Sequence, residues 1–347
     1  MKTIRTIALA SLLCAAAPAA AQVQLNGAGA TFPNIIYQKW ILTFNQTNPT
    51  IQLNYQSIGS GGGIRQFSDG TVDFGGTDAP MTDSAIAAIQ GNVLHIPTVL
   101  GAIVAIYNLP GVTQQLKFTP DVLADIFLGK ITKWNDARIG SVNQGVTLPA
   151  TDIVVVHRAD GSGTTYGWTD YLTKVSPEWA SQVGKGASVN WPVGLGGRGN
   201  EGVSATVNQT PGAIGYTELG YATINKMTFG QVRNSAGKFV APTLEAVTAA
   251  AAGALAALGK MGANTDFRVS ITNPEGASAY PIATMTWLLL HKTYTDAAKA
   301  KALVQYVWWA ETDGQAMAAD LGYAPLPQQL RPWIQARLKT ITASTAQ

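Results

Sequence analysis

The stretch HRADGSGTTYGW, which runs from His157 to Trp168, carries side chains that suit two kinds of chemistry. Ser162 lies among glycines just before an expected helix, where a nucleophilic serine could be placed. Arg158 ends the preceding apolar run, and its planar guanidinium can bind an oxyanion through two parallel N–H donors. The stretch therefore indicates either a hydrolase that uses Ser162 as its nucleophile or a site that binds an anion.

Two earlier loops, GAGATFP and SIGSGGG, are also rich in glycine and small hydroxyl residues and also precede expected helices. We expect Pro33 at the first helical position, Ser60 as an N-cap, and Asp160 or Ser162 as the cap in the third loop. The first amides of a helix lack internal partners and lie at the positive end of its dipole, so they bind anions. One such loop is typical of an ordinary turn, but three favour convergence on a small oxyanion. The candidate donors are Ala30, Thr31, Phe32, Ser60, Ser162, Gly163 and Thr164.

Two carboxylates accompany these donors. Asp78, in VDFGGTDAP, would by itself be a turn residue or a helix cap. In an anion site a carboxylate repels the ligand, unless the ligand carries a proton that the carboxylate can accept. Phosphate near neutral pH carries one and sulfate does not, so Asp78 favours phosphate and would exclude sulfate. Asp160 is expected to pair with Arg158 and to hold the guanidinium in position.

Enzyme classes fit the sequence less well. A serine hydrolase needs a G-x-S-x-G elbow with a histidine partner, but Asp160 stands two residues before Ser162, and none of the three histidines lies in a catalytic pattern. The stretch GLGGRG, residues 194–199, matches a dinucleotide fingerprint in letters only, because NWPV before it is a poor strand; we expect a loop near the cleft rim. No cluster has metal-ligand spacing. We predict a binding protein without catalytic residues, metal or cofactor. The alternatives are a receptor for sulfate or molybdate, and a secreted phosphatase or other phosphoester hydrolase with the same anion site.

The N-terminus has the features of a secretory signal peptide. Lys2 and Arg5 precede an apolar run, and the small residues 19–21 predict cleavage before Gln22. Leu13 before Cys14 argues against lipid attachment, so we expect a periplasmic protein without a lipid anchor. The balance of 23 basic and 20 acidic residues, with no basic run among aromatics, argues against nucleic acid as a partner. No other stretch, AVTAAAAGALAALG included, is expected to be long and apolar enough for a membrane helix.

The elements that must position these loops alternate between two periodicities. IQLNYQSIG alternates as a strand, while VLGAIVAIYN and DIVVVHR are the continuous apolar runs of strands buried on both faces. Tyr37, Trp40, Ile41 and Phe44 follow helical spacing. Alternating strands and helices predict an α/β fold, and the chain length suggests two domains.

Seven stretches carry a family resemblance that covers nearly the whole chain after the leader. The chain resembles the periplasmic phosphate-binding proteins of high-affinity phosphate ABC transporters. The stretches are GAGATFP, YQSIGSGGG, VDFGGTDAP, LGKITKWND, RADGSGT, WPVGLGGRGN and PGAIGYTELGYA. The resemblance implies the class II periplasmic-binding-protein fold, with two domains that each contain a mixed sheet flanked by helices and with the ligand in the hinge cleft. It implies a domain made of residues 22–98 and 271–347 and a second domain of residues 99–270.

The same resemblance implies site residues and partners. The amides of Ala30, Thr31 and Phe32 and the Thr31 hydroxyl would contact phosphate, and Ser60, Ser162, Gly163 and Thr164 would be further donors. Asp78 would accept the phosphate proton, Arg158 would bind the anion and Asp160 would support Arg158. The sequence departs from the family at His157, which we expect to face away from the ligand, and at Gly61. The implied partners are inorganic phosphate and the permease and ATPase subunits of the transporter, and we expect a monomer that closes by a hinge motion.

Overall fold

The structure is a computed structural model that describes residues 22–344. The expected signal peptide, its cleavage site and Cys14 lie outside these residues. The strands are β1 (Val23–Gly29), β2 (Ile51–Ser57), β3 (Phe74–Thr77), β4 (Leu94–Tyr107), β5 (Lys117–Phe118), β6 (Val154–Arg158), β7 (Leu195–Gly197), β8 (Ala213–Glu218), β9 (Thr228–Phe229), β10 (Gln231–Arg233), β11 (Phe239–Val240), β12 (Ala283–Leu290), β13 (Thr293–Tyr294), β14 (Ala324–Pro325) and β15 (Thr342–Ala343). The α-helices are α1 (Asn34–Thr47), α2 (Ser60–Ser68), α3 (Asp83–Ala88), α4 (Pro120–Phe127), α5 (Ala137–Gly140), α6 (Gly163–Val175), α7 (Pro177–Gln182), α8 (Gly199–Gln209), α9 (Leu219–Ile224), α10 (Leu244–Met261), α11 (Ala297–Glu311) and α12 (Arg331–Leu338).

One mixed sheet runs through the molecule in the order β2-β1-β3-β12-β4-β8-β6-β7. Its centre is β4, a strand of 14 residues that are all buried, as the continuous apolar run predicts. Residues 94–102 of β4 pair with β12, and residues 103–107 pair with β8, both antiparallel. The strands β1, β2 and β3 are mutually parallel, and so are β6, β7 and β8. The predicted α/β fold with mixed sheets is confirmed.

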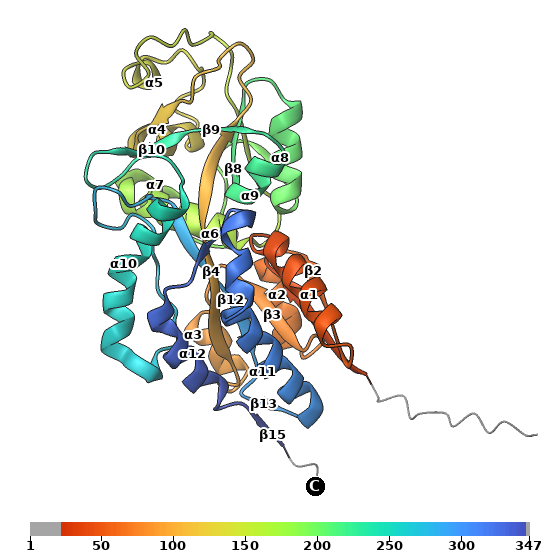
Figure 1. The fold of residues 1–347 in the computed structure, drawn as a ribbon. Helices are drawn as coiled ribbons and strands as arrows, with labels where there is room; N and C mark the ends of the chain where they lie inside the picture. The colour runs from red at the N-terminus through yellow and green to blue at the C-terminus, as the bar shows by residue number, and fades with distance from the viewer. Residues whose placement is uncertain (1–21, 345–347) are drawn as a thin grey trace, which may run out of the picture.

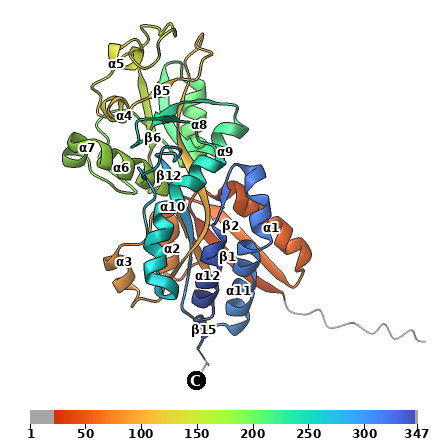
Figure 2. The same ribbon diagram turned by 60° about the vertical axis from the view of Figure 1, so that its left-hand side comes forward.

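Helices cover both halves of this sheet. The elements α1–α3 and β1–β3 lie in the same half as the C-terminal helices α11 and α12, while α4–α9 lie in the other half (Figure 1, Figure 2). The helical spacing predicted for α1 is confirmed, because Tyr37, Trp40, Ile41 and Phe44 are all buried. The Trp40 indole N–H also donates to the carbonyl oxygen of Gly314, at 2.7 Å, which joins α1 to the C-terminal part of the chain.

The exact division into two domains stays a proposal. A boundary between residues 98 and 99 would fall inside β4, whose pairing changes from β12 to β8 between Ala102 and Ile103. Helix α10 precedes residue 271, yet it contacts β12, β14 and β4 and lies beside α12 in the first half (Figure 2). These contacts favour domain boundaries at which the chain passes from the first half to the second near residue 102 and returns before residue 244.

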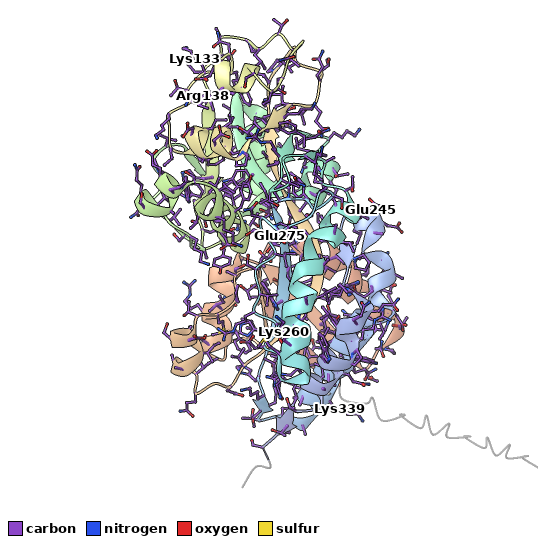
Figure 3. The ribbon with its side chains drawn as sticks, turned by 90° about the vertical axis from the view of Figure 1, so that its left-hand side faces the viewer. Lys133, Arg138, Glu245, Lys260, Glu275 and Lys339 are labelled. Atoms are coloured by element: carbon purple, nitrogen blue, oxygen red, sulfur yellow. The ribbon has the colours of Figure 1, made fainter. Side chains whose placement is uncertain are left out.

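Helix α10 also bears on the expectation of no further membrane-spanning stretch. Among the described residues, α10 is the one helix that is long enough and apolar enough to cross a membrane, judged by its length and composition. By this test of length and composition, the expectation was wrong. Its inner side is buried, with Val247, Ala250 and Leu258 in the core. Glu245 and Lys260 mark its two ends (Figure 3).

Candidate functional site

The structure brings the three predicted loops together where β1, β2, β3 and β6 end. The Gly163 amide donates to Ser60 Oγ at 3.0 Å, and the Asp78 amide donates to the same oxygen at 3.1 Å. Arg158 Nη1 donates to Thr31 Oγ1 at 3.1 Å. Strand β6 runs antiparallel to β1–β3, so its carboxyl end points toward theirs from the other half of the sheet, and loops far apart in sequence share one small volume.

The entries of the helices differ in detail from the sequence-based prediction. Of the two predicted caps of α6, Asp160 and Ser162, Ser162 is the N-cap, because its Oγ accepts from the Thr165 amide at 3.0 Å. Gly59, and not Ser60, is the N-cap of α2, and its φ of 88° favours glycine. Pro33 is the N-cap of α1, so the helix begins one residue later than predicted.

Some of the predicted donors are already used within the protein. The Ala30 amide donates to the Gly76 carbonyl at 2.9 Å, so in this structure it is not free to bind an anion. The Ser162 amide likewise donates to the Ala187 carbonyl at 2.8 Å. Among residues 22–344, no acceptor pairs with the amides of Thr31, Phe32, Ser60 and Thr164 or with the buried Thr164 hydroxyl. These groups are available to an anion.

Arg158 supplies the positive charge of the site. Its side chain is 1% exposed, and its Nη2 lies 2.5 Å from Asp160 Oδ2 while its Nε donates to Oδ1 at 2.8 Å. Partial burial would raise the pKa of the Asp160 carboxyl, but the hydrogen bonds and charge of Arg158 hold it below its ordinary value. The predicted pairing of Asp160 with Arg158 is therefore present in the structure.

Asp78 is a buried carboxylate beside these donors. Burial raises its pKa to about 7, although hydrogen bonds from Thr286 and Ser60 and the charge of Arg158 act in the opposite direction. Thr286 Oγ1 donates to Asp78 Oδ1 at 2.7 Å, which leaves Oδ2 toward Ser60, 3.4 Å away. A Cβ atom at Gly163 would lie 2.5 Å from Asp78 Oδ2, so only glycine fits there.

Two tyrosines that the sequence analysis did not single out hold the first loop. Tyr221 donates to the Thr31 carbonyl and Tyr323 to the Phe32 carbonyl, each at 2.6 Å. Both carbonyls are thereby satisfied, and their peptide groups are kept in place with the neighbouring amides free. Tyr221 lies within the quoted stretch PGAIGYTELGYA, but no local pattern connects either tyrosine to a loop 190 or 291 residues away.

The stretch GLGGRG is not the expected loop. It forms β7 and the start of α8, because the glycines allow close packing: a Cβ at Gly197 would lie 2.7 Å from the Val203 nitrogen. The Gly199 amide at this helix entry donates to Asp160 Oδ1 at 3.0 Å. A carboxylate of the protein therefore takes the position that a dinucleotide phosphate would need. The next residue, Asn200, also contacts the site and was missed.

The histidines lie away from Ser162. His157 stacks on Trp191 with ring centroids 4.7 Å apart, and His95 Nε2 accepts from the Met81 amide at 3.1 Å. Burial lowers the pKa of His95 to about 4. Since no histidine in the described chain contacts the Ser162 hydroxyl, the elements of a serine triad are not assembled there.

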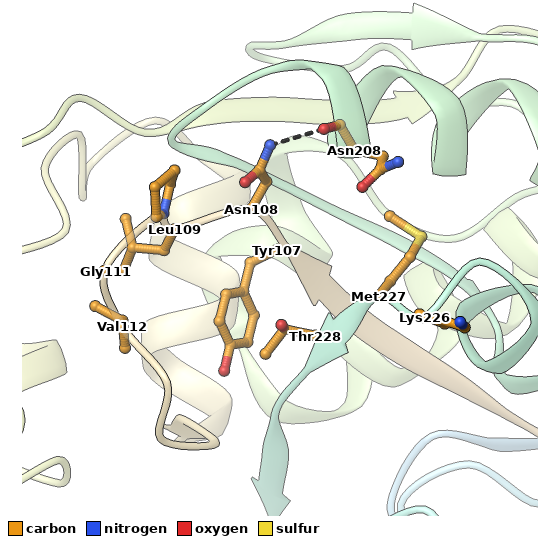
Figure 4. Close-up of a pocket in the computed structure, with 10 residues that line it drawn as sticks. Tyr107, Asn108, Leu109, Gly111, Val112, Asn208, Lys226, Met227 and Thr228 are labelled. Atoms are coloured by element: carbon orange, nitrogen blue, oxygen red, sulfur yellow. Dashed lines mark hydrogen bonds between the residues drawn. The ribbon is translucent and has the colours of Figure 1, made fainter.

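Of two surface hollows in the described chain, one lies away from this site and one reaches it. One of about 240 Å³ lies at the end of β4, between Tyr107, Val112 and Met227 (Figure 4). The hydrogen bond drawn in the figure runs from Asn108 Nδ2 to the Asn208 carbonyl oxygen, at 2.9 Å. Another, of about 190 Å³, reaches Asp78 from the side of Thr284 and Trp287. Only the latter touches the residues described above.

Comparisons with known proteins agree on one family. A family model for the PBP superfamily domain matches residues 15–311. The phosphate-binding protein PstS of Pasteurella multocida is 45% identical over 344 residues, which cover 99% of this chain and 98% of that protein. A phosphate-binding protein from Stenotrophomonas maltophilia has the same fold, with a TM-score of 0.67, 20% identity and coverage of 90% and 93% of the two chains. An ABC-type phosphate transport receptor from Vibrio cholerae gives a TM-score of 0.56 at 18% identity, with coverage of 87% and 100%.

Proposed function

Because this chain belongs to the PBP superfamily and, within it, to the PstS phosphate-binding proteins, we propose that it binds inorganic phosphate for an ABC importer. It is a binding protein and not an enzyme. The proposed location is the periplasm, reached through the N-terminal signal peptide. The proposed partners are the permease and ATPase subunits of the transporter, and the receptor would act as a monomer.

One observation carries the proposal: a buried carboxylate lies near an arginine and free backbone amides, which can only donate hydrogen bonds. Arg158 and the free amides of Thr31, Phe32, Ser60 and Thr164 would bind the ionised oxygens of phosphate. Asp78 would accept the hydrogen bond from the protonated oxygen. Sulfate has no such proton, so its oxygens would face the carboxylate without a hydrogen bond.

The binding mechanism would be a closure of the two halves of the sheet. Ser60 and Asp78 lie in the half that contains α1–α3, while Gly163 and Arg158 lie in the half with α4–α9. An anion between them would be contacted from both halves, so it would stabilise the closed arrangement. The Ser162 hydroxyl caps α6 and is proposed as a donor to the anion, not as a nucleophile.

Isothermal titration calorimetry of the phosphate-free protein with phosphate and with sulfate tests the proposal. We expect tight phosphate binding and a much weaker response to sulfate. Equal affinities would contradict the role of Asp78, and the absence of phosphate binding would contradict the proposed function as a whole.

A further inference from the structure

Asn200 is a fully buried side chain in the first turn of α8, directly beside the site. Its backbone amide donates to Thr31 Oγ1 at 3.3 Å. Its side-chain Oδ1 accepts from Arg158 Nη1 at 3.1 Å. Asn200 is therefore hydrogen-bonded to two residues that the proposed function assigns to phosphate binding.

The Arg158 contact decides how the Asn200 amide is turned. A guanidinium has only donors, so the atom that faces it must be the amide oxygen and not the nitrogen. The nitrogen, Nδ2, is buried and has no hydrogen-bond partner among residues 22–344. Buried polar groups are nearly always paired, and an unpaired donor destabilises the protein.

The Thr164 hydroxyl is a second buried donor without a hydrogen-bond partner among the described residues. Thr164 Oγ1 is buried and lacks a partner within the described chain, and Thr164 belongs to the predicted donors at the entry of α6. Two unpaired donors thus lie in the first turns of different helices, α6 and α8, which both begin at the site. A common acceptor between them would satisfy both.

We propose that Asn200 Nδ2 donates a hydrogen bond to an oxygen of the bound anion, which makes Asn200 a direct binding residue. This inference rests on the proposed function and adds a donor to that site. Asn200 would contact an ionised oxygen beside Arg158, while Asp78 takes the protonated one. The two residues would together orient the single proton of the ligand.

The substitution Asn200→Asp separates this role from simple positioning of Arg158. It keeps an acceptor for the Arg158 guanidinium and removes the donor, whereas Asn200→Ala removes both. If Nδ2 contacts the anion, Asn200→Asp should lower the phosphate affinity by about 100-fold. Asn200→Ala should lower it less, by about tenfold. The added carboxylate also repels the anion, so the decisive result is the reverse order: weaker binding by Asn200→Ala than by Asn200→Asp overturns the inference.

A second measurement does not depend on either variant or on the charge that aspartate adds. In ¹⁵N-labelled wild-type protein, the side-chain amide signals of Asn200 are followed by NMR during addition of inorganic phosphate. We expect a shift of these signals and slower exchange with water at saturation. Unchanged signals in protein that binds phosphate overturn the inference alone, while wild-type protein without phosphate affinity would refute the proposed function as well.

Discussion

The substitution Asp78→Asn changes one oxygen of the site into a donor, and the shorter of the two hydroxyl contacts to Asp78 indicates which one. Thr286 Oγ1 donates to Asp78 Oδ1 at 2.7 Å, so the amide oxygen of the variant keeps that position. The amide nitrogen then replaces Oδ2, the atom that lies toward Ser60 and Gly163. The variant would present a donor where the wild type presents an acceptor.

The size of the effect follows from the hydrogen bonds that change. Phosphate loses a hydrogen bond to a charged acceptor, which contributes about 1.5–3 kcal/mol. Sulfate no longer faces an unpaired buried carboxylate, a penalty of about 1–3 kcal/mol or more. The ratio of the phosphate affinity to the sulfate affinity should therefore fall by about 100-fold or more.

Competitive calorimetry with both anions measures this ratio at one pH and salt concentration. Asp160→Asn is the matched control, because Asp160 also is a carboxylate near the anion but is bonded to Arg158 and the Gly199 amide. It should weaken both anions and leave their ratio nearly unchanged. If Asp78→Asn bound both anions with the wild-type ratio, the proton-accepting role of Asp78 would be refuted.

Three further expectations concern charge, pH and catalysis. Arg158→Ala should weaken phosphate binding by about 2 kcal/mol or more, whereas Arg138→Ala, in a surface ion pair at the far end of the molecule (Figure 3), should not change the affinity measured by calorimetry. Burial raises the pKa of Asp78 from 3.8 to about 7, so the folded state binds this proton more tightly than the unfolded state. As the pH rises from about 4 to 8 without phosphate, the wild type should therefore lose up to about 4 kcal/mol of unfolding free energy relative to Asp78→Asn. Urea titrations of both proteins measure this difference. If the unfolding free energies of the two proteins changed in parallel with pH, the raised pKa would be contradicted. Ser162→Ala should lower the unfolding free energy by about 1 kcal/mol through the lost cap, and neither it nor the wild type should hydrolyse a phosphate ester; turnover lost on substitution would restore the hydrolase interpretation.

Local chemistry made much of the site predictable. The helix entries at Thr31, Ser60 and Ser162 could be identified because small hydroxyl residues and glycines before a helical pattern have few other uses together. The pair Arg158 and Asp160 is separated by one residue, so its ion pair needed no long-range information. Asp78 could be interpreted from the charge of an anion alone, before any geometry was known.

The amino-acid sequence therefore specifies the kind of group that each loop offers, since capping and side-chain chemistry depend on neighbouring residues. Contacts between distant parts of the chain select which of these groups remain free. The Ala30 amide is used by Gly76 across the β1–β3 pair, and the Ser162 amide by Ala187. Thr286 turns Asp78 from 208 residues away, and Asn200 comes from a helix whose entry looked like a loop. Strand register and long-range packing set these partners, and no local pattern encodes them.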